Sequence, residues 1–165
     1  MKNTDDIDFL LTLHPHGWST CWIYINDKKV ELTISHIFTD PYYDFMKSLS
    51  QLMDKQKETT FFWYGEPGGE RIIIKRIQDR QHMIHVKVDG FYEPYGEKIK
   101  DFETTIEFEI KEKQLIILAY YQLKKISFLL KEESFSKNRE KDFPFKDFVK
   151  FEDKVKGYFE LEKGH

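Results

Sequence analysis

The sequence contains only one cysteine, Cys21, among its 165 residues. A single cysteine cannot form an internal disulfide, and it excludes a zinc site built from several cysteine ligands. A reducing compartment is therefore expected.

Long hydrophobic runs are also lacking. The longest is LIILAYY at 115–121, far shorter than the roughly 20 residues that a membrane-spanning helix needs. The N-terminal stretch MKNTDDIDFLLTLHPHG carries three aspartates and has neither the basic region nor the small-residue cleavage site of a secretory signal. These features predict a cytoplasmic protein without a membrane partner.

An excess of charge of one sign is missing as well. The 26 basic and 29 acidic side chains leave a net charge of −3, so long-range attraction for nucleic acid is not expected. Aromatic residues are abundant, with 15 Phe, 9 Tyr and 3 Trp, which is atypical of disordered chains. We expect a single folded domain over residues 1–165.

Alternation of apolar and polar residues predicts the strands. Period-two patterns or runs of β-branched and aromatic residues mark seven segments, separated by turn dipeptides such as Asn26-Asp27. The predicted strands are 7–13, 18–25, 29–36, 59–64, 70–77, 82–88 and 102–110.

Three segments have helical patterns instead. Asp40-Pro41 is a helix-start signal, and the apolar residues that follow it recur at three and four positions up to about Lys57. Further helices are predicted over about 112–133 and 145–159. The order of the elements predicts an α+β fold, with an antiparallel sheet of six or seven strands and two or three helices packed on one face.

The glycine-rich stretch GEPGG at 65–69 raises a choice between a structural turn and a ligand-binding loop. Glycine permits positive φ and proline fixes φ, as a hairpin loop requires. A phosphate-binding loop would be followed by a helix, whereas ERIIIKR is a strand pattern. The hairpin is the favoured interpretation, and a ligand loop remains the alternative.

No set of residues has the spacing of a catalytic or metal site. His14, His16 and His36 have no acidic partner at fixed spacing, and no GxSxG motif accompanies the serines. Cys21 lies within an apolar strand, where cysteine is usually an inert small hydrophobe. We therefore predict no catalytic residue, no metal and no cofactor.

The side of the predicted sheet that faces away from the helices is the candidate binding surface. Alternation in the second strand places either its aliphatic or its aromatic residues on that open face, and the aliphatic set is the better core. Aromatic and arginine residues are enriched at the centres of protein interfaces. The predicted binding residues are Trp18, Trp22, Tyr24, Arg71, Lys75, Lys87 and Glu107. In the alternative, Trp18 and Trp22 are core residues and the open face is merely charged.

Several stretches together resemble a widespread family of small uncharacterised bacterial proteins. They are GW at 17–18, VELTISHIFTDPYYDFMKSLSQL at 30–52, FFWYGEPGGERIIIKR at 61–76 and FPFKDFVKF at 143–151. The chain departs from the family pattern at Gly69, where an acid is usual, and at Ile73, where tryptophan is frequent. The resemblance implies no established activity, although small proteins of this kind are often similar to immunity partners from bacterial toxin loci.

Two classes of function follow from the sequence. The first is a non-catalytic module that binds another protein, such as an immunity or antitoxin-like partner. The second is a small-ligand-binding protein or enzyme, with its site on the open sheet face or near the EPGG hairpin. The sequence does not indicate an oligomeric state.

Overall fold

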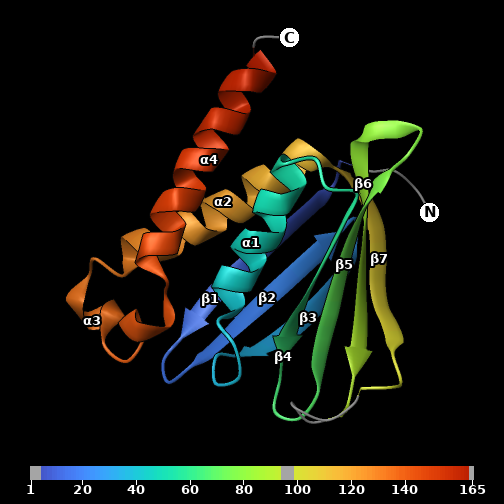
Figure 1. Ribbon diagram of the computed structural model, residues 1–165. Helices are drawn as coiled ribbons and strands as arrows, with labels where there is room; N and C mark the ends of the chain where they lie inside the picture. Colours follow the sequence, from blue (N-terminus) through green and yellow to red (C-terminus); the bar gives the residue numbers. More distant parts are fainter. Residues whose placement is uncertain (1–4, 94–98, 164–165) are drawn as a thin grey trace.

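The computed structural model describes residues 5–93 and 99–163, which form two antiparallel sheets and a group of helices (Figure 1). The first sheet has three strands in chain order: β1 (Ile7–His14), β2 (Trp18–Ile25) and β3 (Lys28–Ser35). The second has four, also in chain order: β4 (Glu58–Tyr64), β5 (Gly69–Ile77), β6 (Arg80–Phe91) and β7 (Glu103–Lys111).

The helices follow each sheet in the sequence. They are α1 (Pro41–Met53), α2 (Glu112–Leu129), the single turn α3 (Glu133–Ser136) and α4 (Phe145–Lys163), with a short 3₁₀ turn at Glu140–Asp142. The α+β class and the antiparallel strands agree with the prediction.

Helix α1 begins as its sequence indicates. The side chain of Asp40 accepts a hydrogen bond from the backbone N–H of Tyr43 at 3.0 Å, and Pro41 occupies the first turn. The helix ends at Met53, before the predicted end at Lys57, because Lys55 has a φ of 66° and leaves the helical conformation.

The prediction of one sheet of six or seven strands is wrong. Strands β3 and β4 are not hydrogen-bonded to each other, so each group of strands forms its own sheet. The chain between them forms α1, which packs on β4 and α4. A cavity of about 40 Å³ is lined by β1, β2 and β3 and also by β4, β5, β6 and β7. The inner faces of the two sheets therefore share one core, and their outer faces point in different directions.

The core alternates along the strands as expected for half-buried sheets. In β1 the buried residues are Ile7, Phe9, Leu11 and Leu13, and β4 buries Phe61 and Trp63. Helix α2 contacts β1, β6 and β7 and thereby joins the two sheets. No helix in the described part of the chain is long and apolar enough to cross a membrane.

Candidate functional site

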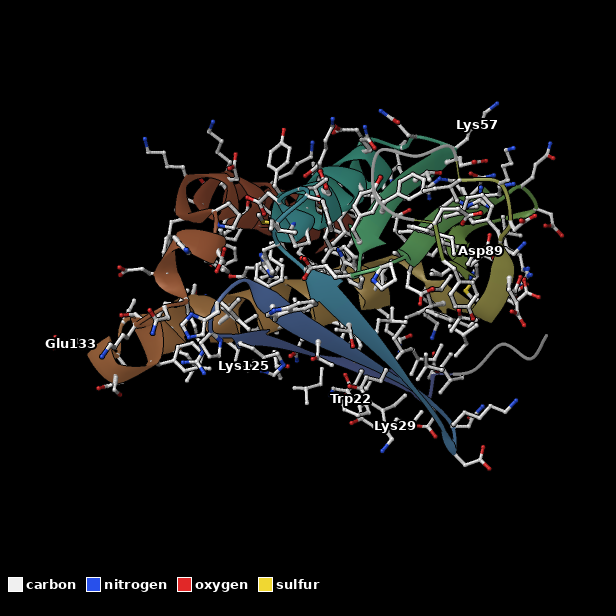
Figure 2. The ribbon with its side chains drawn as sticks, turned by 90° about the horizontal axis from the view of Figure 1, so that it is seen from below. Trp22, Lys29, Lys57, Asp89, Lys125 and Glu133 are labelled. Carbon is white, nitrogen blue, oxygen red and sulfur yellow. The ribbon has the colours of Figure 1, made fainter. Side chains whose placement is uncertain are left out.

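The seven predicted binding residues do not share one surface, because the strands that carry them belong to two sheets. Trp18, Trp22 and Tyr24 lie on the outer face of the three-stranded sheet, where Lys29 Nζ lies 4.9 Å from the centre of the Trp22 ring. Figure 2 shows Trp22 and Lys29 on the side of this sheet away from α1. Both Trp18 and Trp22 are partly buried and neither belongs to the core, so the core alternative is wrong.

The other four residues lie on the outer face of the four-stranded sheet, where the three basic ones are paired with carboxylates and Glu107 contacts a histidine. Arg71 binds Asp89 at 2.8 Å, and Lys87 lies 3.7 Å from the same carboxylate. Lys75 pairs with Glu58 at 3.5 Å, and Glu107 lies 3.2 Å from His85 Nε2. The three basic side chains of this group are thus each close to a carboxylate of the same face.

Asp89 is held in its charged form by several neighbours in this network. Burial alone would raise its pKa, but hydrogen bonds from Arg71 and Thr104 and the charges of Lys87 and Arg71 hold its pKa below the usual value. The guanidinium of Arg71 also lies 3.5 Å from the centre of the Phe102 ring. The contacts of Arg71 are thus internal to the fold.

A cleft of about 610 Å³ lies between β3 and the end of the four-stranded sheet that carries the EPGG hairpin. Of the predicted binding residues only Trp18 lines it. Three aromatic rings and four carboxylates face the cleft, together with glycines, proline and threonines. The aromatic and acidic members are Trp18, Phe91, Tyr92, Glu31, Glu66, Glu70 and Glu103.

Among the described residues that line this cleft there is no lysine, arginine or histidine. Within the described residues, moreover, none of these three residue types forms an ion pair with Glu70. The cleft is therefore a local concentration of negative charge in a chain with nearly balanced charge.

Glycines let the backbone form the wall of the cleft. Gly65 donates its N–H to the Gly68 carbonyl at 2.7 Å, which closes the hairpin between β4 and β5. A Cβ on Gly69 would lie 2.5 Å from the Trp63 carbonyl oxygen, and one on Gly90 would lie 3.3 Å from Glu70 Oε2. The hairpin interpretation of EPGG is confirmed, and the same loop also lines the cleft.

Glu70 is the most perturbed acid of the cleft. Burial is the main reason that its pKa is raised, and the nearby charge of Asp89 adds to the effect. Thr105 Oγ1 donates a hydrogen bond to Glu70 Oε2 at 3.2 Å and partly offsets it. A cation beside Glu70 would stabilise its charged form.

A buried serine–histidine pair was missed by the sequence analysis. Ser19 Oγ lies 2.6 Å from His36 Nε2 and 2.7 Å from the hydroxyl of Tyr42. Burial lowers the pKa of His36 to about 4, so the ring is neutral at pH 7. Ser19 is 0% exposed, which prevents attack on a substrate, and its hydrogen bond to Tyr42 joins β2 to α1. The spacing of 17 residues between the partners gave no motif to detect.

The remaining candidates do not form a catalytic or metal site in the described residues. No three side chains among His, Cys, Asp and Glu are close enough to share a metal ion there. His14 hydrogen-bonds Thr20 at 2.8 Å, away from the Ser19–His36 pair. Burial raises the pKa of Cys21 to about 12, so it remains a thiol.

Comparison with known proteins gives no match for this chain among family models, curated proteins or solved structures. The geometry and charge of the cleft are consequently the features that bear on function.

Proposed function

We propose that the protein is a non-catalytic binding protein whose site is the acidic cleft and whose partner is another protein. The observation that carries this proposal is the described lining of the cleft, which has four glutamates and three aromatic rings and contains no basic residue. Carboxylates attract cations, and aromatic faces bind ammonium and guanidinium groups. The partner would therefore present lysine or arginine side chains.

The raised pKa of Glu70 supports a positively charged ligand. Its raised pKa means that the folded protein disfavours the carboxylate relative to the unfolded chain. A partly buried acid without a basic ion-pair partner among the described residues costs stability, and an arriving cation would offset this cost. Functional sites are where such unfavourable charges are expected.

An immunity or antitoxin-like role is the form of this proposal that the family resemblance favours. Such a protein would act in the cytoplasm and would cover a basic surface of its target, with Trp18 as an apolar anchor. The Ser19–His36 pair does not supply a nucleophile to the cleft, because Ser19 is fully buried.

The test is a titration with a hexalysine peptide at low ionic strength, followed by calorimetry. The double variant Glu31→Gln/Glu70→Gln should bind about 10-fold or more weakly, because two carboxylates of the cleft lose their charge. The matched control is Glu58→Gln/Glu160→Gln, which removes two exposed acids outside the cleft and should change the affinity less than about 3-fold.

Folding stability separates loss of the site from loss of the fold. Because the pKa of Glu70 is raised, Glu70→Gln should keep or increase the free energy of unfolding at pH 7. Equal losses of affinity in the cleft and control variants, or no binding of hexalysine at all, would show the proposal to be wrong.

A small organic cation is the second candidate ligand, and the volume of the cleft favours it. About 610 Å³ lies within the range of small-molecule sites. Spermidine is a suitable probe because it has the charge of a basic peptide segment without a peptide backbone. Binding of spermidine that is tighter than that of hexalysine would favour this candidate.

A further inference from the structure

The edge strands β1 and β7, one from each sheet, differ in how their outer edges are covered. An edge strand exposes backbone N–H and C=O groups that can pair with another chain. Helix α2 and the segment after α3 cover the edge of β1. Gln122 Oε1 accepts a hydrogen bond from the Leu11 N–H at 3.1 Å, and Lys125 Nζ donates to the Leu11 carbonyl at 2.8 Å. Arg139 Nε donates to the Leu13 carbonyl at 3.0 Å.

The edge of β7 has no such cover in the described part of the chain. Its nine residues pair with β6 on one side only, and Figure 1 shows β7 as the last strand of its sheet. Among residues 5–93 and 99–163, none forms a hydrogen bond with the backbone groups on the other side. At about 3.3 Å per residue, this edge is about 30 Å long.

The side chains of β7 indicate which strand would fit beside it. Glu107 lies on the outer face with a 47% exposed side chain, and Glu103 lines the acidic cleft where the strand begins. On the inner face Ile106 is only partly buried against the core. A strand with basic residues at alternate positions and apolar residues between them would match both faces.

A second copy of this chain is a poor occupant. Glu107 and Glu109 lie on the same outer face of β7, where they pair in register with Lys87 and His85 of β6. Antiparallel pairing of β7 with itself around these two residues, with the apolar side chains kept on one face, places glutamates beside glutamates. Like charges opposite each other destabilise a sheet.

We propose that β7 accepts an extended, lysine- or arginine-bearing segment of the partner protein as a fifth strand of its sheet. This inference rests on the proposed function, because the added strand would run into the acidic cleft at Glu103. Backbone hydrogen bonds to β7 would hold the segment, and the glutamates would select its charge.

The test uses the heptapeptide Lys-Val-Lys-Val-Lys-Val-Lys and two N-methylated forms of it. One form carries methyl groups on the lysine amides after the first residue, and the other carries them on the valine amides. Charge and side chains are unchanged, but each form loses the N–H groups of one edge. If the peptide pairs with β7, one form should bind about 30-fold more weakly and the other should change less than about 3-fold.

Equal affinities of the two methylated forms, whether reduced or retained, would overturn strand addition. If hexalysine still binds in the cleft in that case, the proposed function survives and only the strand pairing fails. Amide hydrogen exchange gives a second readout, since alternate amides of β7 should become protected when the unmethylated peptide binds. Unchanged exchange across β7 would also overturn the inference.

Charge selection is tested by Glu107→Gln, whose side chain is exposed enough for the fold to tolerate the change. The affinity for the basic heptapeptide should fall about 5-fold. Lys125→Met is the control at the other edge, because it changes the covered strand β1 and should leave peptide affinity unchanged. Equal effects of the two substitutions would contradict pairing at β7.

Discussion

Two polar clusters connect the sheets to the helices by hydrogen bonds. One cluster is charged and the other is neutral. In the four-stranded sheet, Arg76 of β5 pairs with Glu112 at the start of α2, where their side chains are only 8% and 3% exposed. In the three-stranded sheet, Ser19 of β2 bonds His36 and Tyr42, and no member of this cluster is charged at pH 7. The contact between sheet and helix is thus made by ions in one sheet and by neutral groups in the other.

The charged cluster joins more elements. Glu112 accepts hydrogen bonds from Arg76, from Tyr158 of α4 at 3.1 Å and from Lys55 at 3.4 Å. Arg76 also donates to the carbonyl of Leu52 in α1 at 3.0 Å and to that of Gln81 at 2.9 Å. A buried ion pair is tolerated here because further hydrogen bonds satisfy most of its polar atoms, Arg76 Nε excepted. We therefore expect substitutions in the charged cluster to lower the free energy of unfolding more than substitutions in the neutral one. Low pH, in contrast, should lower it through the neutral cluster.

The largest effect is expected from Glu112→Ala. It leaves the Arg76 guanidinium buried without its counter-charge, which should lower the free energy of unfolding by about 3–5 kcal/mol in denaturant titrations. Lys55→Ala is the control, because the Lys55 side chain is 63% exposed and its loss should cost less than about 1 kcal/mol. The double variant Arg76→Met/Glu112→Leu should recover at least half of the loss, since no buried charge then remains. A cost of Glu112→Ala close to that of Lys55→Ala would refute the buried-ion account.

Lowering the pH should destabilise the fold through the neutral cluster, because His36 becomes protonated. Burial lowers the pKa of His36 in the folded protein from the usual value of 6.5 to about 4, so protonation favours the unfolded chain. The stabilisation is complete above pH 6.5 and is lost progressively as the pH falls toward 4. Between pH 7.5 and pH 5 the wild type should lose about 2 kcal/mol more than His36→Gln in urea titrations, from the shift in pKa.

The comparison with His36→Gln removes the contribution of other titrating groups. Asp40 and Asp142, whose pKa values are raised by burial, and Lys141 line the same pocket as His36. They are present in both proteins, so their shared effects largely cancel in the difference. Parallel pH profiles of the two proteins would mean that His36 does not titrate as its burial indicates.

The sequence predicted the elements of both regions better than their assembly. All seven strands and the three long helices agree with local period and with signals such as Asp40-Pro41. The spacing of apolar residues along a strand indicates which side chains share a face. In β2 this spacing predicted that Trp18, Trp22 and Tyr24 lie on an outer face, where the structure has them. The spacing does not report whether β3 pairs with β4, so one sheet was predicted where two exist.

The cleft and the two polar clusters could not be predicted from the local spacing of apolar residues either, because this spacing does not show which distant segments meet. Trp18, the EPGG hairpin and Glu103 come from distant parts of the chain and meet only because β3 crosses the end of the second sheet. Arg76 and Glu112 are 36 residues apart. Glu112, taken alone, had the pattern of a solvent-exposed residue at the start of a helix.

The smallest effect should come from Tyr42→Phe, which tests whether the neutral cluster is as tolerant as its lack of charge implies. The Tyr42 ring is fully buried and packs edge-on against His36, and phenylalanine keeps this packing. Only the hydroxyl is lost, and Ser19 can still hydrogen-bond His36. The free energy of unfolding should therefore fall by about 1 kcal/mol, the typical net contribution of one neutral hydrogen bond. Ser19→Ala, which leaves both His36 and Tyr42 without this partner, should cost more than Tyr42→Phe. A loss of about 3 kcal/mol or more for Tyr42→Phe, as large as that expected for Glu112→Ala, would remove the distinction between the two clusters.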